Sequence, residues 1–305
     1  MIGQMSRLLV LAAGLIVSSQ SLSSLPTKWG YKETTADELG PEDWKVSYPN
    51  CGGSHQSPID FPMSEISHIE FWDMDRPPLR CGGDCAKFSL KKLEDVYKWE
   101  IQNDQHCTVK SVNVHNREYT LLQFHLHATS EHTVNNYHYD AELHFVHKDI
   151  SGSGNLLVMG IFLHAEEGAA HNRFINNLLG DMAVDDETLD LQESDLNYAD
   201  MLNGLVGKSH LINYSGSLTT PPCSENVDWW VLHTPMSISF DDLDKIEKLY
   251  SELSSTKDAS NNRPPQPLND REITYYYRRP RIEQRCCDEG QAVIADDFKE
   301  ELEVN

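Results

Sequence analysis

The sequence contains little positive charge. Lys and Arg account for 25 of its 305 residues, whereas Asp and Glu account for 48, and the formal net charge is −23. Proteins that bind nucleic acids neutralise phosphates with a basic surface, so this composition argues against a nucleic-acid partner. An acidic surface instead favours solubility and weak binding of cations such as calcium.

Long hydrophobic runs are also scarce. The run at 8–17 covers about ten residues, which is too short to span a bilayer, and no other segment is long enough, so no membrane span is expected. Arg7 precedes this run and small residues follow it from Ser18 to Ser24, which is the order found in secretory signals. We therefore expect residues 1–24 to be a signal peptide and the protein to be secreted.

The chain has neither internal repeats nor an obvious linker. Its composition is even from Trp29 to about Pro280, which predicts a single domain over residues 25–280. The segment 281–305 contains eight acidic and three basic residues and is expected to be a flexible acidic tail.

Seven short alternating or apolar runs predict β-strands, and turn residues separate them. These runs are 87–90, 98–102, 108–114, 119–127, 142–147, 156–163 and 227–235. Three segments predict helices, namely 171–179, 195–204 and 240–253, and the last has Ser239 or Asp241 as its N-cap. The expected fold class is mostly β (α+β), with the helices at the periphery.

Histidines recur at strand spacing in two of these runs. His125 and His127 are two residues apart, so they project from one face of a strand, and Glu142 and His144 share a face of another. If the two strands are neighbours, three imidazoles converge. Three neutral imidazoles leave a fourth tetrahedral position open, which is typical of a catalytic zinc. Gln123 and Glu142 are placed to accept the second ring N–H of His125 and His144.

A second motif holds a hydroxyl rigidly. In the segment 216–222, two prolines follow Thr219 and Thr220, and proline restricts both its own backbone and that of the residue before it. A single Thr-Pro pair would indicate only a turn. Together with the histidines and with the segments 56–60 and 130–133, it indicates a functional site.

These pieces together resemble the α-class carbonic anhydrases. The matching segments occur in the family's order and cover about 29–275; they are 29–31, 40–44, 56–60, 123–127, 130–133, 141–147, 159–163, 216–222 and 263–269. The resemblance implies a central, mostly antiparallel twisted sheet of about ten strands with helices outside it. It also implies a zinc enzyme that hydrates CO2 reversibly to bicarbonate and a proton through zinc-bound hydroxide.

The resemblance assigns roles to residues of the site. His125, His127 and His144 resemble the ligands of Zn2+. Thr219 resembles a gatekeeper that accepts a hydrogen bond from hydroxide and donates one to a carboxylate, which Glu131 resembles. Gln123, Glu142 and a backbone carbonyl near Asn261 resemble the outer partners of the three histidines.

The resemblance also implies a substrate pocket and a proton shuttle. His106 follows the stretch 101–105, which resembles the family's strand leading to its shuttle histidine. An exposed imidazole is suited to passing protons to buffer. The residues that resemble the CO2 pocket are Val146, Val158, Leu218, Thr220, Val227 and Trp229. The short stretch 128–130 resembles the bacterial, plant and algal members, in which one rim of the site is more open.

Seven cysteines leave at least one without an intramolecular partner. The resemblance to secreted members implies a disulfide between Cys51 and Cys223. The remaining pairing stays open: Cys81 could bond Cys85, or one of them could bond Cys107. Cys286 and Cys287 could link two chains into a disulfide-bonded dimer or anchor the tail.

Other polar residues carry further expectations. His132 and His147 resemble structural histidines. Asn213 lies in a glycosylation sequon, and a glycan there is possible only if its side chain faces outward. Six further histidines are read as surface or internally bonded residues, namely His115, His138, His164, His171, His210 and His233. A non-catalytic binding or matrix protein on the same fold, for storage or mineral association, is the alternative function. Since all three zinc histidines are present, the enzyme is favoured.

Overall fold

The computed structural model describes residues 26–83, 85–102, 105–111, 117–184, 188–190 and 197–279. The expected signal peptide and the expected tail lie outside these residues, as do His115, Cys286 and Cys287. Within them, no helix is both long enough and apolar enough to cross a membrane.

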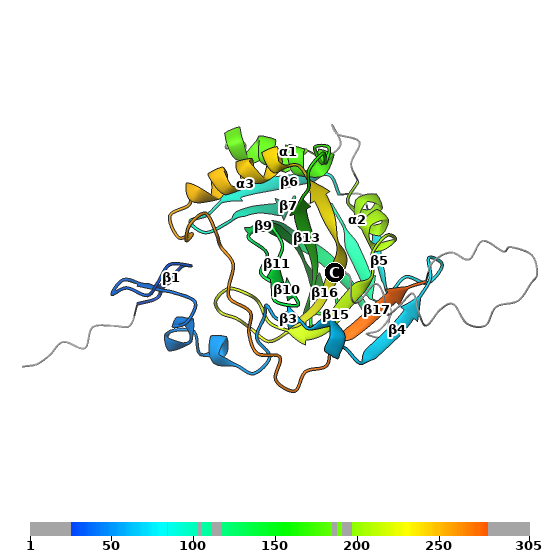
Figure 1. Ribbon diagram of the computed structural model, residues 1–305, viewed down its shortest axis with the longest axis horizontal. Coiled ribbons are helices and arrows are strands. Elements are labelled where there is room, and N and C mark those ends of the chain that lie inside the picture. Colours follow the sequence, from blue (N-terminus) through cyan, green and yellow to red (C-terminus); the bar gives the residue numbers. More distant parts are fainter. Residues whose placement is uncertain are drawn as a thin grey trace, which may run out of the picture.

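A twelve-stranded sheet forms the centre of the described chain (Figure 1). Its main path runs β14–β6–β7–β9–β12–β13–β16–β15–β17–β4, and β8 joins β5 to β9. The strands are β4 His68–Trp72, β5 Leu79–Gly82, β6 Lys87–Lys92, β7 Tyr97–Ile101, β8 Thr108–Ser111, β9 Arg117–Ala128, β12 Ala141–Asp149, β13 Leu156–Ala165, β14 Thr188–Asp190, β15 Leu211–Gly216, β16 Val227–Ile238 and β17 Thr274–Arg278.

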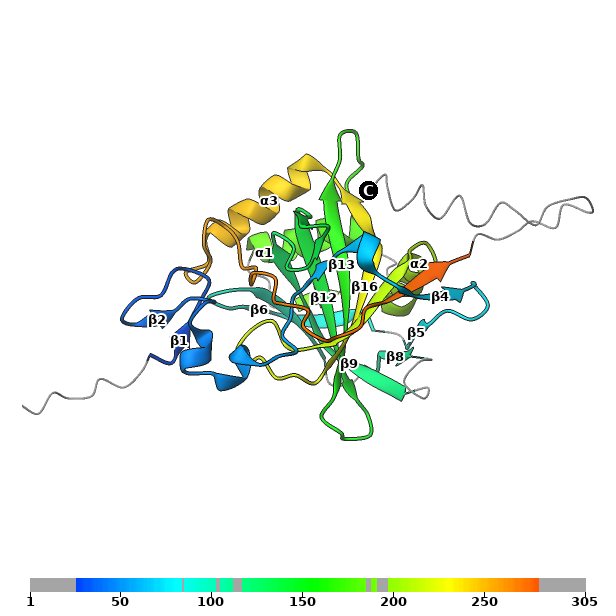
Figure 2. The same cartoon turned by 60° about the horizontal axis from the view of Figure 1, so that its bottom comes forward.

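The sheet is mostly antiparallel, as expected. Among the described strand pairs of this sheet, only β13–β16 and β17–β4 are parallel. Figure 2 shows β12, β13 and β16 side by side through the middle of the molecule. Two small sheets complete the strands: one pairs β1 (Lys28–Trp29) with β2 (Glu38–Leu39), and the other joins β3 (Asp60–Phe61), β10 (Thr133–Val134) and β11 (Tyr137–His138).

The described residues include three α-helices, which lie outside the main sheet (Figure 1). They are α1 (Arg173–Val184), α2 (Tyr198–Val206) and α3 (Phe240–Ser251), close to the expected segments. Ser239 is the N-cap of α3, because its side chain accepts a hydrogen bond from Asp242 N. Asn172 plays the same part before α1, where it accepts from Phe174 N and Ile175 N. Short 3-10 helices are η1 (Trp44–Val46), η2 (Pro49–Gly52) and η3 (Met63–Glu65).

The alternation of side chains along β9 separates two hydrophobic clusters. Phe124 and Leu126 belong to the cluster that includes Phe174 of α1 and Tyr250 of α3. The second cluster contains Phe61, Phe162 and Trp229 among others. His125 and His127 point to the opposite side of β9 from Phe124 and Leu126, as their two-residue period requires. The helices therefore cover one side of β9 and leave the other side for the histidines.

Several strands were not among the seven predicted runs. β17 has the sequence Thr-Tyr-Tyr-Tyr-Arg, a strong β-former without clean alternation, and β4 at the sheet edge is largely exposed. Because neither strand alternates between buried and exposed residues, the periodicity test does not detect them. The sheet therefore has twelve strands rather than about ten.

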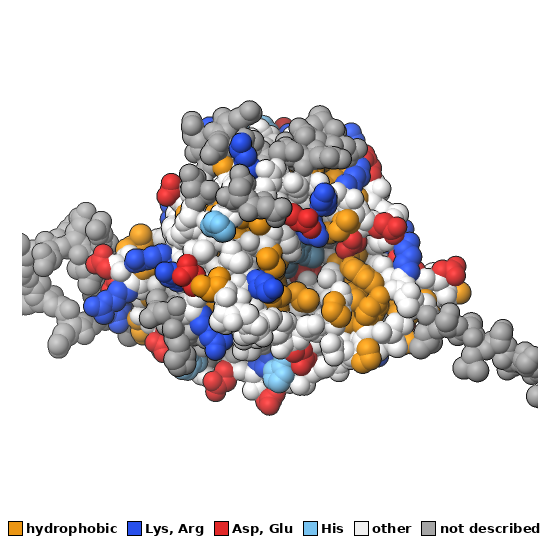
Figure 3. Space-filling view, turned by 180° about the vertical axis from the view of Figure 1, so that it is seen from behind, with side chains coloured by type: hydrophobic (Ala, Val, Ile, Leu, Met, Phe, Trp, Pro, Cys, Tyr) orange, Lys and Arg blue, Asp and Glu red, His pale blue; other side chains and the backbone are white. Residues whose placement is uncertain are grey.

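The face in Figure 3 shows basic side chains scattered among acidic ones rather than gathered into one basic surface.

Candidate metal centre

Strand register brings the three histidines together. β9 and β12 are antiparallel neighbours, with His144 opposite His125 and Glu142 opposite His127. The ring centroids lie 4.9 Å apart for His125 and His127, 5.2 Å for His125 and His144, and 4.6 Å for His127 and His144. One nitrogen from each ring lies within 4.8 Å of the other two, so the three could hold a metal ion.

Each imidazole is held by one outer hydrogen bond. His125 Nδ1 lies 2.9 Å from Gln123 Oε1, and His127 Nδ1 lies 2.9 Å from the carbonyl oxygen of Asn261. His144 Nε2 lies 2.9 Å from Glu142 Oε1. If each of these nitrogens donates, the inward nitrogens keep free lone pairs: Nε2 of His125, Nε2 of His127 and Nδ1 of His144.

The inward nitrogen of His127 is the observation that favours a metal most directly. It is buried and has no hydrogen-bond partner among the described residues. A buried polar atom without a partner is costly, and a cation would supply one. The structure therefore places the residues predicted as ligands, and their three outer partners, in an arrangement that fits a metal with one open position.

The three imidazoles are neutral at neutral pH. Burial lowers the pKa of His127 to about 4, against the opposing hydrogen bond to Asn261. Burial, together with the charges of His127 and His144, lowers the pKa of His125 well below its usual range. Burial also lowers the pKa of His144, although Glu142 opposes this. Neutral rings are the form that binds a metal.

Glu142 connects the metal centre to the loop that follows β9. Its Oε2 accepts hydrogen bonds from the backbone N–H groups of Glu131 and His132, both at 2.9 Å. Its Oε1 lies within hydrogen-bond distance of His144 and His132. Burial acts to raise the pKa of Glu142, but His132 and His144 outweigh it and hold that pKa well below its usual range.

Glu131 is a second buried carboxyl with a different environment. Its Oε1 accepts a hydrogen bond from Arg263 N at 2.9 Å, whereas its Oε2 has no hydrogen-bond partner in the described part of the chain. This Oε2 lies 3.4 Å from His127 Nε2. Burial raises the pKa of Glu131 to about 7, although His144, Thr219 and Arg263 act to lower it.

Thr219 lies in a loop that is fixed from both sides. Ser57 N donates to Ser217 Oγ at 2.9 Å, and Ser217 N donates to Ser57 Oγ at 3.0 Å. Trp229 Nε1 donates to the carbonyl of Ser217 at 3.0 Å. Gly216 begins this loop, and a Cβ there would lie 2.2 Å from Ser57 Oγ, so only glycine fits. The buried Thr219 is near enough to Glu131 to lower its pKa.

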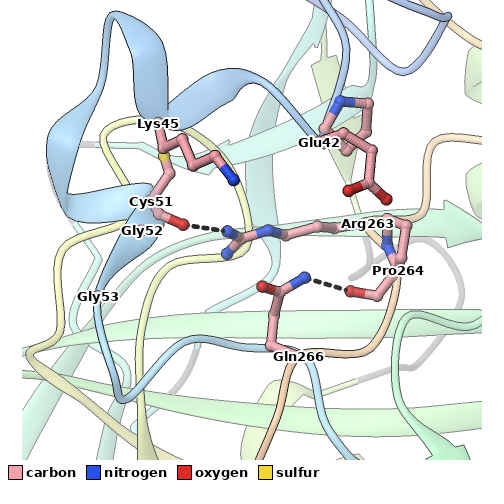
Figure 4. Close-up of a pocket in the computed structure, with 9 residues that line it drawn as sticks. Glu42, Lys45, Cys51, Gly52, Gly53, Arg263, Pro264 and Gln266 are labelled. Atoms are coloured by element: carbon pink, nitrogen blue, oxygen red, sulfur yellow. Dashed lines mark hydrogen bonds between the residues drawn. The ribbon is translucent and has the colours of Figure 1, made fainter.

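The predicted disulfide between Cys51 and Cys223 is present and closes this loop. Arg263 braces it, since its Nη2 donates to the carbonyl of Cys51 at 3.0 Å and its Nη1 donates to Gln56 Oε1 at 2.9 Å. Figure 4 shows the Arg263 side chain between Lys45 and Glu42 on one side and Gln266 on the other, in a pocket of about 200 Å3. Sequence reasoning gave Arg263 no role, although it lies in a matching segment.

The apolar residues predicted for the substrate pocket lie together. Val146 pairs with Val158 across β12 and β13, and Val158 pairs with Trp229 of β16. All belong to the second hydrophobic cluster with Val227, and Leu218 packs against it. The Trp229 and His144 ring centroids lie 4.8 Å apart, so this cluster reaches the metal centre. The sixth predicted residue, Thr220, is half-buried between Thr219 and the prolines.

His106 lies between β7 and β8, and its side chain is exposed. The following residue, Cys107, accepts a hydrogen bond from Leu121 N at 2.8 Å, four residues before His125 on β9. The backbone next to His106 therefore lies against Leu121 of β9, which is beyond Gln123 from His125 and His127.

The cysteines near His106 decide between the open pairings. Cys85 bonds Cys107, and Cys81 is the free thiol among the described cysteines, so the Cys81–Cys85 alternative is wrong. β5 pairs antiparallel with β8, with Gly82 opposite Thr108. Cys85 follows Gly82 and Cys107 precedes Thr108, so both cysteines of the bond lie beyond the same end of this strand pair. Cys81 is buried next to Tyr198, and burial raises the pKa of its thiol to about 12.

Seven other histidines of the described chain have partners within it. His132 contacts Glu142 and Tyr214, and His147 contacts Tyr198. His138, His164 and His171 contact Ser130, Asp140 and Asp242 respectively, while His233 contacts Tyr275 and His210 accepts a hydrogen bond from Arg278 N.

The Asn213 side chain is held against the sheet by hydrogen bonds. Its amide nitrogen donates to Asp228 Oδ1 at 2.7 Å and to the carbonyl of Trp229 at 2.8 Å. Since a glycan would be attached to this nitrogen, its bonds argue against glycosylation at the sequon.

Comparisons with known proteins agree with this geometry. Residues 39–277 match the model of the eukaryotic-type carbonic anhydrase family. A carbonic anhydrase of Nostoc is 32% identical, with 87% of this chain and 95% of the relative covered. A carbonic anhydrase 3 of Homo sapiens is 29% identical over 81% of this chain and 97% of the relative.

A solved structure is similar as well. The α-carbonic anhydrase of Thermovibrio ammonificans, in complex with the inhibitor sulfanilamide, has a TM-score of 0.63 at 30% identity, and the match covers 81% of this chain and 98% of that one. The chain belongs to the eukaryotic-type, or α-class, carbonic anhydrase family. It is therefore an enzyme of this class, and family and fold support CO2 hydration as its reaction.

Proposed function

We propose that the protein is a secreted zinc carbonic anhydrase in which His125, His127 and His144 hold the metal. The observation that carries this proposal is the convergence of three neutral imidazoles whose outer nitrogens are already bonded. Zinc at such a site lowers the pKa of a water molecule from about 15.7 to about 7 and so makes hydroxide available at neutral pH. Neutral ligands leave the positive charge of the metal intact, which favours this effect.

Thr219 and Glu131 orient the nucleophile. An ionised carboxylate can only accept hydrogen bonds, so Thr219 must donate its hydroxyl hydrogen to Glu131. The Thr219 oxygen then accepts a hydrogen bond, which selects a nucleophile that carries a proton. Without a metal, burial raises the pKa of Glu131 to about 7. A cation at the histidines favours the ionised carboxylate, since opposite charges lower the pKa of an acid.

The apolar cluster beside the metal centre receives CO2. Val146, Val158, Val227 and Trp229 offer no hydrogen-bonding groups toward it apart from the indole N–H, which is bonded to Ser217. CO2 has no dipole, so an apolar surface is a suitable receptor.

His106 transfers the proton that hydration releases. The reaction consumes CO2 and water and yields bicarbonate and one proton, which must reach bulk buffer in each turnover. A ring nitrogen of the exposed His106 takes up this proton and passes it to buffer.

Secretion is supported by the disulfides and by the leader-like start of the sequence. Two disulfides within one chain are typical of proteins that fold in an oxidising compartment. The signal at 1–24 and an acidic tail at 281–305 remain predictions from the sequence. N-terminal sequencing of protein recovered from the culture medium of a eukaryotic host tests the first; a mature chain that begins at Met1 would contradict it.

Stopped-flow CO2 hydration with a parallel zinc assay tests the proposal. We expect about one zinc per chain and fast hydration in the wild type, and loss of both in His125→Ala. His164→Ala is the matched control, because it removes a partly exposed histidine whose partner is Asp140. Zinc-loaded but inactive wild-type protein would favour the non-catalytic alternative.

A further inference from the structure

We infer that Arg263, Lys45 and Glu42 form a second binding site for bicarbonate, separate from the three histidines. The site is the pocket of about 200 Å3 beside Cys51, and neither the histidines of the metal centre nor Thr219 line it. The pocket exists whatever the protein does, but the choice of bicarbonate as its ligand rests on the proposed function.

The guanidinium of Arg263 is a buried cation without an acidic partner. The residue is only 1% exposed. Its Nη1 donates to Gln56 Oε1 and to the carbonyl of Ser57, both at 2.9 Å, and its Nη2 donates to the carbonyl of Cys51 at 3.0 Å. All three acceptors are uncharged, and no carboxylate of the described chain forms an ion pair with this guanidinium. A buried charge without a counter-charge is costly, so an anion bound here would be favoured.

The Nε atom of Arg263 indicates a missing ligand most directly. A guanidinium carries five N–H donors, and the Nε–H of Arg263 is buried without a hydrogen-bond partner among the described residues. Burial lowers the pKa of Arg263 to about 10, although Glu131 opposes this, so the group stays charged at neutral pH. Oxyanions bind a guanidinium through two parallel N–H groups, and Nη2 keeps a second hydrogen beside its bond to Cys51.

Two charged side chains lie on the other side of the pocket. Figure 4 shows the Lys45 ammonium and the Glu42 carboxylate directed toward the Arg263 side chain. Both are exposed, and neither forms an ion pair within the described chain. Because Arg263 and Lys45 outweigh Glu42 by one charge, the pocket attracts an anion although the whole chain carries a net charge of −23.

Bicarbonate matches this set of groups. It is a monoanion with two oxygens that share the charge, which Arg263 and Lys45 can bind, and one O–H group, which the Glu42 carboxylate can accept. Its size is suitable as well, since a water molecule takes up only about 30 Å3 in the liquid. Acetate has the same pair of oxygens but a methyl group in place of the hydroxyl. It would leave the Glu42 carboxylate without a donor, so the site should prefer bicarbonate.

The pocket is connected to the loop that holds Thr219. Arg263 Nη2 donates to the carbonyl of Cys51, whose disulfide closes that loop, and Arg263 N donates to Glu131 Oε1. Lys45 and Glu42 take no part in these bonds. They can therefore be changed to weaken the pocket while the brace on the loop stays in place.

NMR of the zinc-loaded full chain with isotopically labelled arginine tests the inference. The signal of the Arg263 Nε–H, identified by its absence in Arg263→Lys, should shift and saturate during a titration with sodium bicarbonate. Sodium acetate should need about threefold to tenfold higher concentrations for half of its shift, because it lacks one hydrogen bond. Glu42→Ala should remove this preference for bicarbonate over acetate.

A pair of lysine variants separates the pocket from the metal centre. Lys45→Met should weaken bicarbonate binding about twofold to fivefold and leave kcat and KM for CO2 hydration unchanged. Lys208→Met is the matched control, because this exposed lysine does not line the pocket, and it should bind bicarbonate like the wild type. An Arg263 shift with the same midpoint in the wild type, Lys45→Met and Glu42→Ala would show bicarbonate bound at the metal centre instead and would overturn the inference.

Crystals of the zinc-loaded protein soaked in bicarbonate give a second readout, which does not need Arg263→Lys to fold. The difference density should show a planar ion between Arg263 and Lys45, and a lone water at Arg263 Nε would overturn the inference. The proposed function fails separately. Protein that hydrates CO2 but has no bicarbonate here refutes only the second site, whereas bicarbonate here in protein without hydration activity refutes only the proposed function.

Discussion

The strands and the loops around the metal centre position their polar groups in different ways. On β9 and β12, register alone brings the histidines together, and Glu142 is surrounded by four hydrogen-bonding groups. In the loops, Glu131 has one bonded oxygen and one without a partner among the described residues. The two carboxyls are equally buried, yet their pKa values are shifted in opposite directions.

The difference shows which region binds and which region reacts. A fully bonded carboxylate such as Glu142 is ionised and fixed, which suits a residue that orients a metal ligand. A carboxyl with an unsatisfied oxygen, such as Glu131, can still form a hydrogen bond with Thr219. The strands should therefore control metal binding, and the loops should control the rate of reaction.

Of the changes considered, removal of the Cys51–Cys223 disulfide should lower the free energy of unfolding the most. The chain-entropy model gives a loss of about 5 kcal/mol in the free energy of unfolding for this bond and about 3 kcal/mol for Cys85–Cys107, because the first closes a much longer loop. Urea denaturation of Cys51→Ala/Cys223→Ala and Cys85→Ala/Cys107→Ala measures both.

The same variant should separate binding from reaction. With the brace on the Thr219 loop removed, Cys51→Ala/Cys223→Ala should keep its zinc and lose hydration rate, because the strand histidines are not attached to this disulfide. Loss of zinc in step with activity would contradict the division between strands and loops.

The pH dependence of stability should reveal the opposite shifts of the two carboxyls. Between about pH 4.5 and 7, the folded metal-free protein keeps a proton on Glu131 that the unfolded chain has released. This group therefore lowers the free energy of unfolding as pH rises, by about 3 kcal/mol in total. Glu142, with its lowered pKa, stabilises the fold above its unfolded pKa and loses that contribution as pH falls.

Glu131→Gln isolates this contribution, since buried histidines titrate in the same range. The difference in unfolding free energy between Glu131→Gln and the wild type should move in favour of the variant from pH 4.5 to 7. Urea denaturation of the metal-free proteins across this range gives the difference. A constant difference would show that Glu131 is ionised throughout.

Loss of different outer partners of the histidines should lower zinc affinity by different amounts. Glu142→Gln removes the charge of a carboxylate bonded to two histidines and two backbone groups, so zinc affinity should fall toward the hundredfold end of the usual range of about 10- to 100-fold. Gln123→Ala removes one neutral acceptor, and its effect should lie near tenfold. Competition with a chelator measures both affinities, and equal losses would contradict the central place of Glu142.

The strand half of the site could be predicted from the sequence, and most of the loop half could not. A period of two places His125 and His127 on one face of a strand, and Glu142 and His144 on one face of another, because side-chain direction in a strand is local. The pairing of these two strands is what the structure adds. The hydrogen bonds between Ser57 and Ser217, and the one from Arg263 to the carbonyl of Cys51, join residues more than 150 positions apart. No local pattern encodes such contacts.

The regions close to His106 show the same limit. Sequence reasoning left the cysteine pairing open, since the spacing of Cys81, Cys85 and Cys107 allows several bonds. The register of β5 with β8 decides it, and register between strands depends on the packing of the whole sheet. Helix α3 was predicted closely because its N-cap and its apolar period are both local features.

Anomalous diffraction at the zinc edge, on crystals of the zinc-loaded protein, tests the central claim most directly. The account predicts one strong peak bounded by Nε2 of His125, Nε2 of His127 and Nδ1 of His144, with Thr219 and Glu131 beside it. A main peak at His132 and Glu142, or none at the three histidines in active protein, would contradict it.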